Sequence, residues 1–103
     1  MIDDGELDWK LIAISSDDAL ADTLNDIEDL QRTGPEVISG IREWFRWYKT
    51  PDGKPLNRYG LGERVLSSKE AIEVIYETNS HWKHLVAGKT DKKKLWIPGG
   101  SAL

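Results

Sequence analysis

The chain has 103 residues, of which 39% are hydrophobic and 31% charged, with a formal net charge of −4 and no cysteine. This length excludes a two-domain design, the missing cysteines exclude disulfides, thiolate metal sites and a cysteine nucleophile, and the acidity argues against nucleic-acid or anionic-membrane partners. No apolar run approaches the ~20 residues of a membrane span and the N-terminus is acidic, so we expect a soluble cytoplasmic protein, with an organellar form left open.

The first predicted element is a strand over residues 9–14, which read Trp-Lys-Leu-Ile-Ala-Ile and are apolar and partly β-branched. Residues 3–8 are expected to be an acidic loop that enters this strand. Residues 15–33 are polar and offer several capping side chains, which predicts a lightly packed connector with one helical turn at 27–30.

Two longer helices follow. Pro35 suits a first helical position, and the chain stops being helical at Thr50-Pro51, which predicts a helix over 35–49. Its expected buried stripe has helical spacing and consists of Val37, Ile41, Trp44, Phe45 and Tyr48.

Residues 54–66 read as a loop with a short irregular strand, and a capping box from Ser67 to Glu70 opens the last helix, over 68–87. Gly88 is expected to end that helix. Its predicted buried stripe is Ala71, Ile75, Thr78, Trp82 and either Leu85 or Val86.

Each of these elements has one apolar face, and together the elements offer little surface against which those faces can pack. A strand also needs sheet partners that this chain barely supplies. The pattern therefore predicts a piece of a larger domain.

The residues 3–10 place four carboxylates in six positions and then a lysine. Such density is costly unless a cation neutralises it, and oxygen ligands point to Mg²⁺ or Mn²⁺ rather than to zinc. Lys10 alternates onto the same strand face as Asp8, so that one side chain could hold a metal ion and the other a phosphate oxygen. The alternative is a polar turn before a strand.

A second group of side chains lies at the end of the predicted 35–49 helix. The hydroxyl of Tyr48, the adjacent Lys49 and the later Lys54 could grip an anion. The alternative is a helix whose aromatic residues are core and whose lysine favours the helix dipole.

Four segments carry recognisable motifs. Residues 1–14 contain Asp-Asp-Gly-Glu-Leu-Asp-Trp-Lys, and residues 24–30 contain Leu-Asn-Asp-Ile-Glu-Asp. Residues 44–57 read Trp-Phe-Arg-Trp-Tyr-Lys-Thr-Pro-Asp-Gly-Lys-Pro-Leu-Asn, and residues 77–90 contain Trp-Lys-His-Leu-Val-Ala-Gly-Lys. They resemble the C-terminal portion of soluble, eukaryotic-type family I inorganic pyrophosphatases. The resemblance makes 1–103 one partial domain, matched over about 1–90, with an unmatched tail at 91–103.

This resemblance implies hydrolysis of pyrophosphate to two orthophosphates with several Mg²⁺ ions, or Mn²⁺, that activate a water molecule. It makes Asp3 and Asp8 metal ligands. It makes Lys10, Tyr48 and Lys49 catalytic residues that contact the substrate, with Lys54 as a further substrate-binding residue. The implied partners are pyrophosphate and phosphate, and the full-length form is implied to be a homo-oligomer, a dimer.

The implied parent fold is an OB-like β-barrel with added helices, an α+β class, of which this chain would supply mostly helix and one or two barrel strands. Four positions depart from the family pattern without touching a proposed ligand: Asp4 and Leu56 replace glutamates, Leu7 a threonine and Asn79 a histidine.

The family's Asp-x-Asp-Pro-x-Asp motif, with the carboxylate that activates water, would lie upstream of Met1, which then reads as an interior residue. We therefore expect the isolated chain to be inactive, because the residues of such a site act as a unit. Two alternatives stay open: a non-catalytic, truncated pyrophosphatase-like interaction module, and a small acidic helical domain whose loop only looks catalytic.

Overall fold

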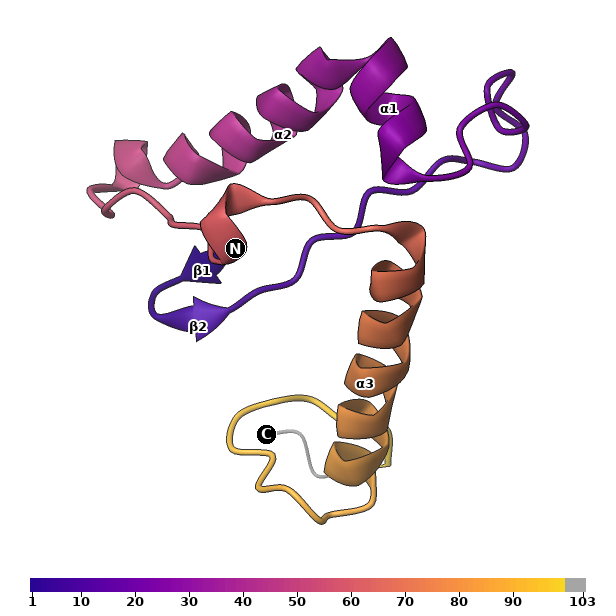
Figure 1. Cartoon of the computed structure of the whole chain (residues 1–103). Helices are drawn as coiled ribbons and strands as arrows, with labels where there is room; N and C mark the ends of the chain where they lie inside the picture. The colour runs from indigo at the N-terminus through magenta and orange to yellow at the C-terminus, as the bar shows by residue number, and fades with distance from the viewer. Residues whose placement is uncertain (100–103) are drawn as a thin grey trace. The chain divides into compact units, whose positions relative to one another are not determined.

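The computed structural model describes residues 1–99 (Figure 1). The chain divides into two compact units, one of residues 1–68 and one that begins at Lys69. The described residues are mostly helical with one two-stranded antiparallel sheet, which confirms the class expected for this chain. Among their helices, none combines the length and the hydropathy that crossing a bilayer needs.

A tight hairpin opens the first unit. Strand β1 (Ile2–Asp3) pairs antiparallel with β2 (Glu6–Leu7), with Ile2 opposite Leu7 and Asp3 opposite Glu6. Asp4 and Gly5 form the two-residue turn, with φ of +51° and +79°, and left-handed conformations at both central positions suit the twist of a hairpin. The acidic loop predicted at 3–8 is therefore a hairpin.

The strand predicted at 9–14 is wrong, since these residues have no regular secondary structure. Leu11 is 50% exposed and Ile12 44%. A strand exists only where a neighbouring backbone completes its hydrogen bonds, and no such neighbour pairs with 9–14 within residues 1–99. The short strand expected in 54–66 is reduced to one bridge, between Arg58 and Ile2.

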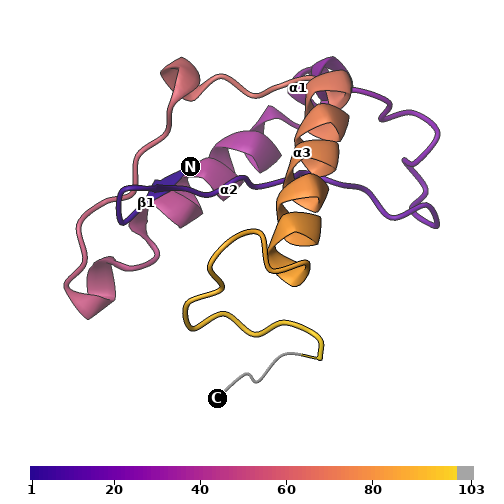
Figure 2. The same ribbon diagram turned by 90° about the horizontal axis from the view of Figure 1, so that it is seen from below.

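Helices α1 (Ile27–Thr33) and α2 (Pro35–Trp47) follow one another and contact each other. α1 is longer than the single turn predicted, because Asp26 and Asp29 form a reciprocal capping box at its start. α2 begins at Pro35 as predicted but ends at Trp47, two residues before the predicted end, and a 3₁₀ turn, η1 (Thr50–Asp52), follows. Both views place β1 beside the C-terminal half of α2 (Figures 1 and 2).

The stripe predicted to be buried on α2 is mostly exposed: Val37 is 44% exposed and Trp44 61%. The face that packs is turned by one residue and carries Ile38, which is 7% exposed. The same face carries Arg42 and Arg46, which are hydrogen-bonded to Tyr59 and Glu63 of a later polar segment. Within residues 1–99 the apolar stripe thus has little cover.

The second unit contains most of α3 (Ser68–Val86), close to the predicted 68–87. Gly88 ends it as predicted: with φ of +78°, it lets its own N–H reach the Leu85 carbonyl at 3.2 Å and that of Lys89 reach His84 at 2.9 Å. This is a Schellman motif.

The prediction of a buried stripe on α3 is wrong, since no residue of this helix is buried. Ile75 is 46% exposed and Trp82 41%. The apolar spacing is helical, but burial also needs a surface to pack against, and spacing alone does not supply one.

Candidate functional site

Three residues singled out from the sequence meet at the end of α2. The hydroxyl of Tyr48, the residue that caps this helix, donates a hydrogen bond to Asp3 Oδ2 at 3.1 Å. The ammonium of Lys49 donates to Asp3 Oδ1 at 2.5 Å. Because β1 lies beside the end of α2, it brings the Asp3 carboxylate, 45 positions from Tyr48 in the sequence, to both donors.

The side chains of this cluster are largely shielded from water, with 12% of Asp3 and 27% of Lys49 exposed. The hydrogen bond from Lys49 lowers the pKa of Asp3, against the opposing effect of its burial, and the bond from Tyr48 lowers it further. The same contact with Asp3 raises the pKa of Lys49. The Lys49 Nζ also lies 3.8 Å from Asp4 Oδ2, so the ammonium charge lies close to two carboxylates.

A second acid–base pair is formed by Asp8 and Lys10, whose Oδ2 and Nζ atoms are 3.2 Å apart. The sequence predicts that these two side chains lie on the same face of a strand. No strand forms there, but the two side chains are neighbours. Lys10 Nζ lies 4.7 Å from the centre of the Phe45 ring, and that ring meets Tyr48 edge-on. Phe45 thus links the second pair to the Asp3–Tyr48–Lys49 cluster.

Lys54, the remaining predicted substrate-binding residue, follows the η1 turn. Its side chain is exposed, and its backbone N–H donates to the Lys49 carbonyl at 3.3 Å. The structure therefore ties Lys54 to the cluster through its backbone.

The two predicted metal ligands, Asp3 and Asp8, are each paired with a lysine. Among residues 1–99, no three acidic or histidine side chains converge into a group that could hold a metal ion. Their donors are nonetheless carboxylate oxygens, and Mg²⁺ is commonly held by one or two carboxylates with water and substrate oxygens completing its shell. The donor set fits Mg²⁺ as part of a site.

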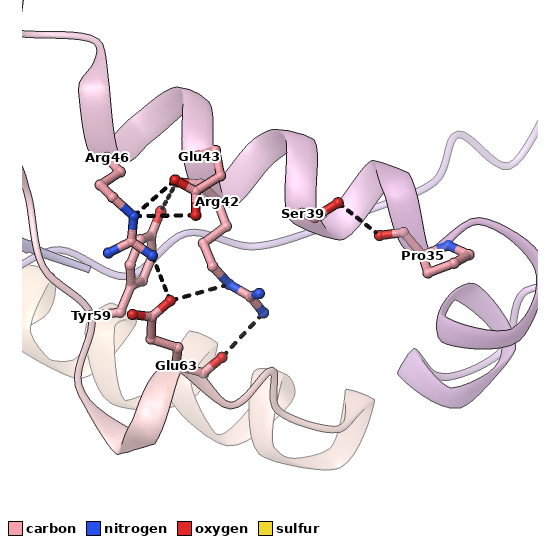
Figure 3. A network of polar contacts seen from close by, with 7 residues as sticks. All are labelled: Pro35, Ser39, Arg42, Glu43, Arg46, Tyr59 and Glu63. Carbon is pink, nitrogen blue, oxygen red and sulfur yellow. Dashed lines mark hydrogen bonds and ion pairs between the residues drawn. The ribbon is translucent and has the colours of Figure 1, made fainter.

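Sequence reasoning missed a polar network on the next face of α2 (Figure 3). Arg46 donates to Glu43 at 3.0 Å and to Glu63 at 2.5 Å. Arg42 donates to the Glu63 carbonyl at 3.1 Å and accepts at its own carbonyl, at 2.9 Å, from the hydroxyl of Tyr59. These bonds attach the segment 57–63 to the helix.

The charges in this network reinforce one another. Hydrogen bonding to Arg46 lowers the pKa of Glu43, and bonding to Glu43 and Glu63 raises the pKa of Arg46. Burial raises the pKa of Tyr59, whose ring lies 5.3 Å from the Arg46 guanidinium. Arginines at successive turns are the available signal. Glu43 lies three positions from Arg46, but the partners Tyr59 and Glu63 are 17 to 21 positions away.

Comparison with known proteins adds a family match. Residues 1–83 match the family model described as inorganic pyrophosphatase. The chain is 50% identical over 95 residues to soluble inorganic pyrophosphatase 6, chloroplastic, of Arabidopsis thaliana, covering 92% of this chain and 32% of the relative. It is 48% identical to the inorganic pyrophosphatase of Candida glabrata, covering 92% of this chain and 33% of the relative.

Solved structures agree with the sequence matches. The type I inorganic pyrophosphatase of Toxoplasma gondii superposes with a TM-score of 0.77 and 44% identity, covering 82% of this chain and 36% of that chain. The vacuolar soluble pyrophosphatase of Trypanosoma cruzi gives a TM-score of 0.79 and 34% identity, and the match covers 89% of this chain and 24% of that chain. The chain spans about a third of the length of the curated relatives that it matches.

Proposed function

Because this chain belongs to the inorganic pyrophosphatase family, we propose that it supplies part of a site that hydrolyses pyrophosphate to two orthophosphates. The observation that carries the proposal is the meeting of Asp3, Tyr48 and Lys49 at the end of α2. We also infer that the complete domain is an OB-like barrel, to which this chain contributes its hairpin and helices.

The donors of this cluster have the chemistry of a phosphate clamp. The Lys49 ammonium and the Tyr48 hydroxyl both point at the oxygens of one carboxylate, and a phosphate oxygen is an acceptor of the same kind. We propose that substrate phosphate takes the place of Asp3 as their partner. Lys10, close to the same aromatic cluster, would supply a second positive charge.

In this proposal Asp3 and Asp8 hold Mg²⁺, with Mn²⁺ as a substitute. When bound, such ions neutralise phosphate charge and lower the pKa of a water molecule. The protein's share is then to bind and orient the phosphates with Lys10, Tyr48 and Lys49, which is where most of the rate enhancement in such reactions arises.

We propose that the 103 residues by themselves do not turn over pyrophosphate, since two carboxylates do not complete a metal cluster within the described residues. A homodimeric full-length form and a cytoplasmic location stay predictions. Of the similar proteins, the Arabidopsis thaliana one is named chloroplastic and the Trypanosoma cruzi one vacuolar.

The test is a binding titration of the chain by NMR with pyrophosphate and magnesium chloride, run beside a phosphate-release assay. We expect shifts at Lys10, Tyr48 and Lys49, and no phosphate release. Lys49→Ala should weaken binding at least about tenfold, since a charge-assisted hydrogen bond is lost. The matched control is Lys83→Ala on α3, an exposed lysine, which should leave binding unchanged; equal effects of both substitutions would contradict the proposal.

A second candidate is the non-catalytic interaction module, favoured by the exposed stripe on α2 that includes Val37, Ile41 and Trp44. It predicts that the chain binds the part of the Candida glabrata pyrophosphatase that lies outside the match, without phosphate release from the mixture. Activity on mixing would favour the catalytic function.

A further inference from the structure

We propose that Asn57 is a positioning residue of the Asp3–Tyr48–Lys49 cluster, which it builds by holding strand β1 against the end of α2. The inference rests on the proposed function only in taking this cluster as a phosphate site. Among the polar side chains of residues 1–99, Asn57 is the buried one, with 5% exposed. Its hydrogen bonds go to Phe45 and Arg46 rather than to the members of the cluster.

Asn57 binds two consecutive carbonyls in the last turn of α2. Its side-chain Nδ2 donates to the Phe45 carbonyl at 2.9 Å, and its backbone N–H donates to the Arg46 carbonyl at 3.0 Å. The last four carbonyls of a helix lack partners within the helix. Asn57 thus caps the helix at the turn that leads into Tyr48 and Lys49.

The residue after Asn57 binds the strand. Arg58 and Ile2 exchange two backbone hydrogen bonds, of 2.7 and 3.2 Å. Ile2 also pairs with Leu7 in the hairpin, so β1 is held on both sides. Asp3 is the next residue, and its carboxylate returns to Tyr48 and Lys49.

These contacts close a ring that runs from the end of α2 through Asn57, Arg58, Ile2 and Asp3 back to the end of α2. Three of its six hydrogen bonds join backbone to backbone, which any sequence can make, and the other three use side chains. The Asn57 amide is the side chain that fastens the ring to the helix on the side away from the cluster. Removing it should let β1 move away from the helix end and separate Asp3 from its two donors.

A matched control exists two residues away. Tyr59 also donates a side-chain hydrogen bond to a carbonyl of α2, that of Arg42 at 2.9 Å. Arg42 lies earlier on the helix, in the network of Figure 3. Tyr59→Phe removes a bond of the same kind between the same two segments, but away from the end where Asp3 docks.

The experiment compares Asn57→Ala, Asn57→Asp and Tyr59→Phe in the full chain. In Asn57→Ala we expect the nuclear Overhauser effects between the Tyr48 ring and Asp3 to disappear, and pyrophosphate with magnesium to bind at least about tenfold more weakly, because small misplacements cost much in such sites. Asn57→Asp keeps the side-chain volume but removes the Nδ2 donor, and it should have the same effects as Asn57→Ala. Tyr59→Phe should preserve both signals.

Persistence of the Tyr48–Asp3 effects in both Asn57 variants would overturn the proposal. So would an equal loss in Tyr59→Phe, or global unfolding of both Asn57 variants while Tyr59→Phe stays folded, since either result means a general structural role. If the parent chain binds no pyrophosphate but the contacts break as expected, the positioning role stands and the phosphate-site function fails.

Discussion

The two units of this chain are stabilised in different ways. Residues 1–68 are joined by hydrogen bonds between segments far apart in sequence, such as Asp3 with Tyr48 and Asn57 with Phe45. In the unit from Lys69 onward, α3 is a long helix with no buried residue, and Thr78 bonds only one turn back, to Val74 and Ile75. The first unit therefore depends on tertiary contacts, which include the bonds from Ser68, the first residue of α3, to Asp26. From Lys69 onward, α3 depends on local helix-forming preference and on its C-terminal cap.

Truncating Ile38 should give the largest difference in lost stability between the two units. Ile38→Ala removes one of the few buried apolar side chains, and we expect it to lower the free energy of unfolding of the first unit by about 2 kcal/mol. Ile75→Ala on α3, where the side chain is 46% exposed, should cost less than about 1 kcal/mol. Urea titrations followed by residue-resolved NMR measure both, and equal losses would contradict the contrast.

Acid should be the next most selective perturbation. The pKa values of Asp3, Asp26, Asp29 and Glu43 are all lowered, mainly by hydrogen bonds from Lys49, Ser68, Asn25 and Arg46 respectively. A folded-state pKa below the unfolded one gives stability that is present above the unfolded value and lost as the pH falls through the folded value. All four residues belong to residues 1–68.

We therefore expect the first unit to lose stability as the pH falls below the ordinary values of 4.5 for glutamate and 3.8 for aspartate. NMR signals of the hairpin and of α2 should broaden before those of α3. Asp3→Asn should flatten the acid slope, and a simultaneous loss of all signals would contradict this prediction. In alkali the sign reverses for Lys49, whose raised pKa gives stability that is lost above its ordinary value of 10.5.

What could be predicted from the sequence divides along the same line. The start of α3 and the role of Gly88 match the predictions and its end differs by one residue, because helical spacing and the C-terminal cap are set by neighbours in the sequence. The hairpin was missed although Asp4-Gly5 is a strong turn signal, since two-residue strands leave almost no alternation to detect. The strand at 9–14 was predicted from composition, which cannot supply a pairing partner.

The candidate site shows the same limit. Tyr48 and Lys49 are adjacent in the sequence and Asp8 and Lys10 two residues apart, so their pairing could be seen locally. That Asp3 joins Tyr48 depends on how β1 docks, and no periodicity encodes that. Asn57 gave no signal either, because its partners lie 11 and 12 positions earlier, in another element.

At the C-terminal cap of α3, Gly88→Ala should destabilise the helix end by about 1 kcal/mol, because alanine is strained in the left-handed conformation. Gly88 has φ of +78° and open space where a Cβ would point, so strain is the whole effect. Amide exchange should quicken at Lys89, whose N–H is part of the cap. Exchange at Asn57 should not change, and a change there would contradict the local nature of this cap.

The smallest expected effect is a gain. Asn79 lies exposed in the middle of α3, and asparagine is less favourable in a helix than alanine by about 0.5 kcal/mol, because its side chain competes for backbone hydrogen bonds. Asn79→Ala should raise helix content by circular dichroism and slow amide exchange within α3. Ser39→Ala on α2 is the matched control: its hydroxyl bonds back to the Pro35 and Glu36 carbonyls, at 3.4 and 3.3 Å, and we expect the tertiary contacts of the first unit to mask the gain in propensity. If local helix preference determines the stability of α3 and long-range contacts determine the stability of α2, only Asn79→Ala is stabilising.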